Sequence, residues 1–176
     1  GVDVPEHVQG RPFLGRDLPP ARRYVFGARD RMDERYDVIR AVRDKRYKYM
    51  LHSFPGTPYL SWIPYRNHHP ILQEMWRLYA AGELVGPQLL MFQRRPPEEL
   101  YDTQSDPFEI RNLAGDPAHA KTLRAMRERL TDWVKGLPDL SFYPESYLMN
   151  NAMEIQELKL AETQKDLEQQ QAEARI

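Results

Sequence analysis

The stretch that decides the fold is PEELYDTQSDPFEIRNLA, residues 97–114. Its Leu-Tyr pair at positions 100–101 supplies the apolar and aromatic residues typical of a short strand. The Asp-Pro pair at 106–107 ends that strand, because proline fixes its own φ and biases the preceding residue away from the helical region. A second Asp-Pro pair at 116–117 favours a helix start, with the aspartate as N-cap. The stretch predicts a strand, a turn and a helix entry, and nothing in it is catalytic.

Further elements lie on both sides of this stretch. Residues 24–28 predict a strand. Residues 38–43 and 47–52 predict a hairpin, because polar and apolar residues alternate and β-branched or aromatic residues are frequent. Residues 69–84 suit a helix, and residues 118–134 predict a longer one. The longer helix has a single apolar face, made by Leu123, Met126, Leu130, Trp133 and Val134.

The order of these elements predicts an α+β fold. A small antiparallel sheet of about four strands carries a helix on one face. We expect an extended connector at residues 1–23, an α+β subdomain at 24–138 and a mostly helical C-terminal extension at 139–176. The extension lacks a sustained heptad pattern. Packing on the subdomain, packing on a partner subunit and a frayed tail therefore stay open for it.

The composition excludes some classes of function. The formal net charge is −1, so bulk electrostatics favours neither nucleic acid nor an anionic membrane as partner. No apolar run approaches the roughly 20 residues of a membrane span, and the sequence shows no signal peptide. There is no cysteine, hence no disulfide and no thiolate site. Arginine far outnumbers lysine, which suits an anionic ligand; ordinary surface ion pairs are the alternative.

Four segments resemble one family, in the same order. Residues 97–114 are similar to the C-terminal signature of type I sulfatases, members of the alkaline phosphatase-like superfamily. Residues 1–14 (GVDVPEHVQGRPFL) and 42–50 (VRDKRYKYM) resemble other segments of that family. Residues 25–34 (VFGARDRMDE) resemble its heparan N-sulfatase branch, which is N-sulfoglucosamine sulfohydrolase-like. The resemblance implies the C-terminal portion of a hydrolase that cleaves sulfuric esters or sulfamates on sulfated sugars such as glycosaminoglycans.

The residues that perform the family's chemistry are not in this sequence. The resemblance implies a calcium ion and a formylglycine in the parent enzyme, the latter made from the Cys or Ser of a C/S-x-P-x-R motif. The nearest proline-x-arginine patterns have Leu18 and Trp62 at the nucleophile position. No Asp-Asp pair is present for the calcium site. We assign no catalytic and no metal-binding residue, and we expect the chain alone not to hydrolyse sulfate esters. Its expected partner is the nucleophile-bearing N-terminal domain.

One charged run is the candidate for substrate contact. It consists of Arg29, Asp30, Arg31, Asp33 and Glu34. In sulfatases the loop after this strand can lean over the pocket, and alternating arginine and acid could pair with sulfate, carboxylate and hydroxyl groups. A solvated, self-paired charge run is the alternative. His52 follows a strand, where a structural role and a sugar contact both stay open. Glu98 and Glu99 cannot be a catalytic pair, because strand neighbours point to opposite faces.

Two functions of different classes follow. The first is the C-terminal portion of a sulfatase, which shapes the substrate cleft around a sulfated carbohydrate and is not catalytic alone. The second is a non-catalytic interaction module, or an oligomerisation module that forms homo-oligomers through its C-terminal helix. The compartment stays undetermined; the resemblance is compatible with a periplasmic, secreted or lysosomal protein.

Overall fold

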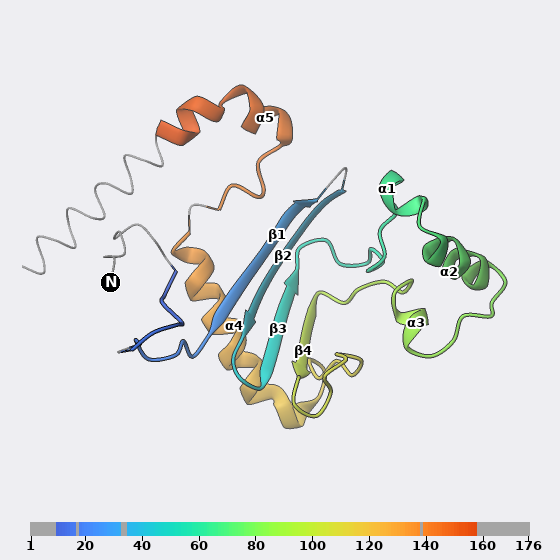
Figure 1. Cartoon of the computed structure of the whole chain (residues 1–176), viewed down its shortest axis with the longest axis horizontal. Coiled ribbons are helices and arrows are strands. Elements are labelled where there is room, and N and C mark those ends of the chain that lie inside the picture. Colours follow the sequence, from blue (N-terminus) through green and yellow to red (C-terminus); the bar gives the residue numbers. More distant parts are fainter. Residues whose placement is uncertain (1–9, 17, 33–34, 138, 158–176) are drawn as a thin grey trace, which may run out of the picture.

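A four-stranded antiparallel sheet forms the centre of the chain. The computed structural model describes residues 10–16, 18–32, 35–137 and 139–157. Within them the strands lie in the order in which they occur in the sequence, so each pairs with the next (Figure 1). The strands are β1 (Val25–Met32), β2 (Arg35–Arg43), β3 (Tyr47–His52) and β4 (Glu98–Asp102). The predicted α+β class, with its small antiparallel sheet, is confirmed.

One long helix covers one face of the sheet (Figure 1). The chain enters it through a short 3₁₀ turn, η1 (Pro117–His119), and continues as α4 (Ala120–Lys135). Asp116 caps this entry as predicted, because its side chain accepts a hydrogen bond from the Ala118 amide at 3.0 Å. The predicted apolar face of α4 packs on the sheet. The buried residues between them are Val42, Tyr49, Leu100, Leu113, Leu123, Met126 and Leu130.

The connection from β3 to β4 carries three short helices. They are α1 (Pro64–Asn67), α2 (Pro70–Ala80) and α3 (Pro87–Leu90), and Figure 1 shows them gathered to one side of the sheet. A second, smaller core of Leu60, Leu84 and Phe92 holds them together. The helix expected at residues 69–84 ends earlier, at Ala80, because the chain turns at Gly82 with a φ of +71°, which glycine adopts readily.

The signature stretch closes the free edge of β4. The Asn112 carboxamide oxygen accepts hydrogen bonds from the amides of Leu100 (3.0 Å) and Ala114 (2.9 Å). Its amide group donates to the Glu98 carbonyl oxygen at 3.0 Å. A side chain thus takes the place of a fifth strand and satisfies edge groups that would otherwise invite strand pairing with another chain. The asparagine of the signature has a structural role.

The turn before Asn112 is also fixed by a side chain. The Asp106 carboxylate accepts hydrogen bonds from the amides of Ile110 and Arg111, both at 2.8 Å. Glu109, directly before Ile110, lies in the left-handed region with a φ of +55°, and its carboxylate pairs with Lys48 at 2.6 Å. A non-glycine residue is held in that conformation only when its surroundings fix it, which this turn does from both sides.

The first strand, β1, is longer than the sequence predicted. The strand expected at residues 24–28 extends to Met32, because pairing with β2 continues through Arg29↔Ile39 and Arg31↔Tyr36. A bulge interrupts the register between Arg29 and Arg31. The charged run expected to be a loop is therefore largely strand, and its Asp33 and Glu34 lie outside the described residues.

The chain after α4 forms the start of the C-terminal extension. It contains α5 (Glu145–Asn150), while residues 158–176 of the expected helical extension lie outside the described part of the chain. The same holds for residues 1–9 of the expected connector, so the three domain boundaries stay predictions. None of the described helices is long and apolar enough to cross a lipid bilayer.

The packing of α4 on the sheet gives the first testable prediction. Leu130 is 2% exposed in the core between α4 and the strands. We expect Leu130→Ala to lower the free energy of unfolding by about 3 kcal/mol, since it removes buried methyl groups and leaves a cavity. Glu128→Ala, at an exposed position of the same helix, is the control. Urea denaturation of both variants measures the difference, and equal stabilities would show that this helix face is not the core.

Candidate functional site

The end of the β1–β2 hairpin brings together three of the predicted ligand-binding residues. Arg29, Asp30 and Arg31 all lie in β1, on either side of the bulge. The chain that follows α4 packs against this end; we call residues 139–145 the strap. The strap contacts hairpin side chains at every second residue, through Asp139, Ser141, Tyr143 and Glu145.

Arg40 is the buried junction between the hairpin and the strap. It lies in the middle of β2 and is 5% exposed. Its guanidinium donates to both carboxylate oxygens of Asp139 at 2.9 Å and to the Asp30 carboxylate at 2.6 Å. Burial alone would raise the pKa of Asp139, but hydrogen bonds from Ser141 and from Arg40 outweigh it and hold that pKa below its usual value. Asp139 is therefore ionised near neutral pH, and it balances the buried cation.

Arg31 holds the far end of the strap. It donates to the Tyr143 carbonyl oxygen at 2.7 Å and forms an ion pair with the Glu145 carboxylate. Its guanidinium also lies over the ring of Tyr36, 5.0 Å from the ring centroid. The Tyr36 hydroxyl in turn donates to the Ser141 carbonyl oxygen. Arg31 thus shapes this end of the molecule through contacts within the protein.

The hairpin end and the strap enclose a hollow of about 680 Å³. We call it the hairpin–strap hollow; it is lined by Arg31, Arg35, Tyr36, Phe142, Tyr143, Pro144 and Glu145. Its lining combines two arginines with three aromatic rings. Arg35 differs from Arg31, because its buried Nε has no hydrogen-bond partner among the described residues. The volume falls in the range of about 300–1,000 Å³ that is common for small-molecule sites.

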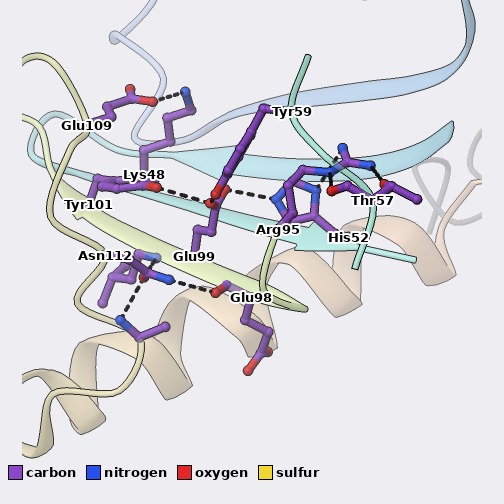
Figure 2. A network of polar contacts seen from close by, with 12 residues as sticks. Lys48, His52, Thr57, Tyr59, Arg95, Glu98, Glu99, Tyr101, Glu109 and Asn112 are labelled. Carbon is purple, nitrogen blue, oxygen red and sulfur yellow. Dashed lines mark hydrogen bonds and ion pairs between the residues drawn. The ribbon is translucent and has the colours of Figure 1, made fainter. Parts of the chain in front are cut away.

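His52 lies away from this hollow, in a buried network on the sheet face opposite α4. It is 4% exposed, and Figure 2 shows it between Arg95 and Glu99. Arg95 forms a two-pronged ion pair with Asp37, at 2.8 and 3.0 Å, and approaches the histidine Nδ1 at 3.5 Å. The histidine Nε2 lies 2.8 Å from the Glu99 carboxylate.

The partners of His52 determine its tautomer. Arginine can only donate, so Nδ1 accepts and the proton of the neutral ring lies on Nε2, directed at Glu99. The other Glu99 oxygen accepts from the hydroxyls of Tyr59 and Tyr101. Burial, and then the Glu99 charge, raise the pKa of Tyr101, which keeps that hydroxyl protonated as a donor. Every group in this network has a partner, which indicates a structural role for His52.

Glu98 and Glu99 point to opposite faces, as the alternation of a strand predicts (Figure 2). Glu98 accepts two hydrogen bonds from Arg127 of α4, at 2.7 and 2.6 Å, and one from Tyr49. These bonds, the Arg127 bond first, hold the pKa of Glu98 below its usual value. Each carboxylate has its own set of partners on its own side of the sheet.

The residues of the described part do not fit a metal ion. No group of three or more His, Cys, Asp or Glu side chains converges in residues 10–16, 18–32, 35–137 and 139–157. A calcium ion needs several converging oxygens, whereas the buried acids Asp37 and Glu99 are already used by Arg95 and His52. No catalytic step through a metal can be derived from these residues.

Among the seven residues that line the hairpin–strap hollow, sequence reasoning predicted Arg31 alone. Arg35 and Tyr36 lie just beyond the charged run, and Phe142, Tyr143 and Glu145 lie more than a hundred positions further along the chain. The available signal was the cluster SFYPE at residues 141–145, where two aromatic residues and a proline follow the end of a helix.

Comparison with known proteins identifies the relatives of the chain. No family model matches it. An ulvan-active sulfatase of Formosa agariphila is 43% identical over 151 residues, which are 85% of this chain and 25% of that protein. The relatives of this chain are sulfatases. Human N-sulphoglucosamine sulphohydrolase is 36% identical over 66 residues, covering 36% of this chain and 13% of the enzyme. The predicted resemblance to sulfatases is confirmed.

The chain spans about a quarter, or less, of the length of these sulfatases. Such coverage agrees with a C-terminal sulfatase region. A solved structure of a 2-O GAG sulfatase aligns with 76% of this chain and 21% of its own, at 23% identity and a TM-score of 0.48.

The buried network around His52 gives the second prediction. We expect Asp37→Asn to lower the free energy of unfolding by about 3–5 kcal/mol, because it leaves the buried Arg95 without its counter-charge. Glu74→Gln is the matched control: it breaks an arginine–carboxylate pair with Arg77 on the exposed surface of α2. We expect no measurable loss from that exposed pair. Thermal or urea unfolding measures the stability of both variants. Similar losses of stability in the two would contradict the assignment of the network as the buried ionic core.

Proposed function

We propose that this chain is the C-terminal portion of a sulfatase that acts on sulfated sugars, and that it shapes the substrate cleft without supplying the catalytic groups. The observation that carries the proposal is the 43% identity with an ulvan-active sulfatase across 85% of the chain. A second relative, human N-sulphoglucosamine sulphohydrolase, also has a sulfated sugar in its name. Both point to a sulfated carbohydrate as the substrate class.

The hairpin end is the part that we place beside the substrate. It carries the arginines of the charged run, and arginine pairs with sulfate and carboxylate groups through parallel hydrogen bonds. Its geometry is fixed by Arg40 and by the strap, which suits a wall that must hold its shape. In this role the residues of the chain bind and orient the sugar.

In such an enzyme the catalytic groups and the metal ligands would belong to the N-terminal domain. Formylglycine would supply the nucleophile for sulfate transfer, and calcium is the metal that the resemblance implies. This sequence contains neither the C/S-x-P-x-R motif nor an Asp-Asp pair. We therefore propose the N-terminal sulfatase domain as the partner of this chain, and binding of the sugar as its own contribution.

The alternative is an interaction or oligomerisation module. It is favoured by exposed apolar residues in and after α5, where Tyr147, Met149 and Met153 are 46%, 74% and 73% exposed. Exposed apolar patches mark interaction sites. A full-length protein that self-associates through this region and hydrolyses no sulfate would support this alternative over the sulfatase.

The test uses the full-length protein that contains this chain. We expect it to hydrolyse a sulfated ulvan oligosaccharide. Arg31→Gln should lower kcat/KM on that oligosaccharide by about tenfold, because it removes a cation from the hairpin end and loosens the strap. The loss should be small with a minimal aryl sulfate, which reaches only the catalytic pocket. Arg124→Gln, at an exposed position of α4, is the control.

Three results would contradict the proposal. Absence of any sulfate hydrolysis by the full-length protein would remove the sulfatase assignment. Equal losses on both substrates would assign Arg31 to folding. Unchanged kinetics of the Arg31→Gln variant on the oligosaccharide would show that the hairpin end does not line the cleft.

A further inference from the structure

The hairpin–strap hollow has features that a merely structural contact does not require. Arg31 is already used by Tyr143, Glu145 and Tyr36, and so it belongs to the frame of the hollow. Arg35 also lines the hollow, yet its buried Nε has no partner among the described residues. That Nε is itself inaccessible, so an anionic ligand group would pair with the part of the guanidinium that lines the hollow.

We propose that the hairpin–strap hollow is a subsite for one sulfated sugar unit, with Arg35 contacting the sulfate group of that unit. The inference rests on the proposed function and adds to it: the subsite is made jointly by the hairpin and by the C-terminal strap. The strap thereby becomes a determinant of specificity.

The aromatic lining favours a sugar as the ligand. Phe142 and Tyr143 of the strap are 65% and 45% exposed, and Tyr36 of the hairpin is 40% exposed. These three rings line the same hollow as the arginines. A sugar ring presents apolar C–H groups on its faces and polar groups around its edge, so it matches rings flanked by charged side chains. Sites of this kind combine an apolar lining with a few polar groups that fix orientation.

The charges of the lining favour an anion. Two arginines face one glutamate in the hollow, and that glutamate is paired with Arg31. Arg35 is therefore the cation left for a ligand. A long polyanion such as nucleic acid would need a row of basic side chains, which this lining does not offer.

The strap is held firmly enough to form a wall. Asp139 binds Arg40 through both carboxylate oxygens, and the side chain of Arg40 is 6% exposed. The pKa of Asp139 lies below its usual value, so this carboxylate stays ionised in mildly acidic as well as neutral solution. A preformed subsite loses little conformational entropy on binding, which favours affinity.

Binding to the 176-residue chain itself tests the proposal, without any need for catalysis. The probes are a sulfated ulvan tetrasaccharide, its desulfated counterpart and inorganic sulfate, each titrated by calorimetry. We expect the sulfated tetrasaccharide to bind more tightly than either of the others. Arg35→Gln should weaken its binding about tenfold, whereas Arg124→Gln, the matched exposed arginine, should leave it unchanged.

The Phe142→Ala variant distinguishes recognition of the sugar ring from recognition of the anionic group. It should weaken binding of the tetrasaccharide and leave binding of inorganic sulfate unchanged, because the ring contacts only the sugar. Equal affinities for the sulfated and desulfated probes, or equal losses in the Arg35 and Arg124 variants, would overturn the subsite. Displacement of the tetrasaccharide by a DNA oligonucleotide of equal charge at the same concentration would overturn it too, in favour of unspecific polyanion binding.

The two proposals fail in different ways. If the full-length protein hydrolyses no sulfate while the chain still binds the sulfated tetrasaccharide through Arg35, the sulfatase assignment falls and the subsite stands. If hydrolysis occurs and the Arg35 variant binds like the unmodified chain, the subsite alone is wrong.

Discussion

The geometry of the candidate site depends on one buried cation, the guanidinium of Arg40. A buried charge is tolerated only when counter-charges and hydrogen bonds surround it. Arg40 takes its partners from two segments: Asp30 at the bulge of β1 and Asp139 at the start of the strap. Satisfying one arginine therefore fixes the bulge and brings the strap to the hairpin. The contacts of Arg31 further along then follow from where the strap has been placed.

Side chains alternate between the two faces of the sheet along each strand, and the two faces differ in character. On one face, Tyr49 and Leu100 join α4 in an apolar core. On the other face, His52 and Glu99 belong to a buried ionic network with Arg95. The signature stretch completes the sheet at its edge, because the Asn112 side chain hydrogen-bonds to the backbone of β4. A motif that helps to recognise sulfatases from sequence thus has a structural role in this chain.

The sequence predicted the elements whose signal is local. The strands and α4 were found because their apolar residues recur at the period of the element, and Asp116 was found because N-caps have a short sequence pattern. Strand alternation also separated Glu98 from Glu99 correctly. The length of β1 was not predictable in this way, since only pairing with β2 extends it past residue 28.

The candidate site was predicted in part, for a physical reason. The charged run at residues 29–34 marked the hairpin end, but the partner of Arg31 at Tyr143 is 112 positions away, and no local pattern encodes such a contact. The partners of His52 were equally hidden, because Arg95 and Glu99 lie 43 and 47 positions further along the chain, after the three helices α1 to α3. The predicted contacts of Asp33 and Glu34 lie outside the described residues and stay predictions.

The most direct test of the central claim is an experimental structure of the full-length protein with a sulfated ulvan oligosaccharide bound. We expect one sugar unit of the bound chain in the hairpin–strap hollow. Its anionic group should lie at hydrogen-bond distance, about 3 Å, from the Arg35 guanidinium, and its ring should lie against Phe142. A structure in which another part of the protein fills this hollow, or in which the oligosaccharide is bound with the hollow facing away from it, would contradict the claim.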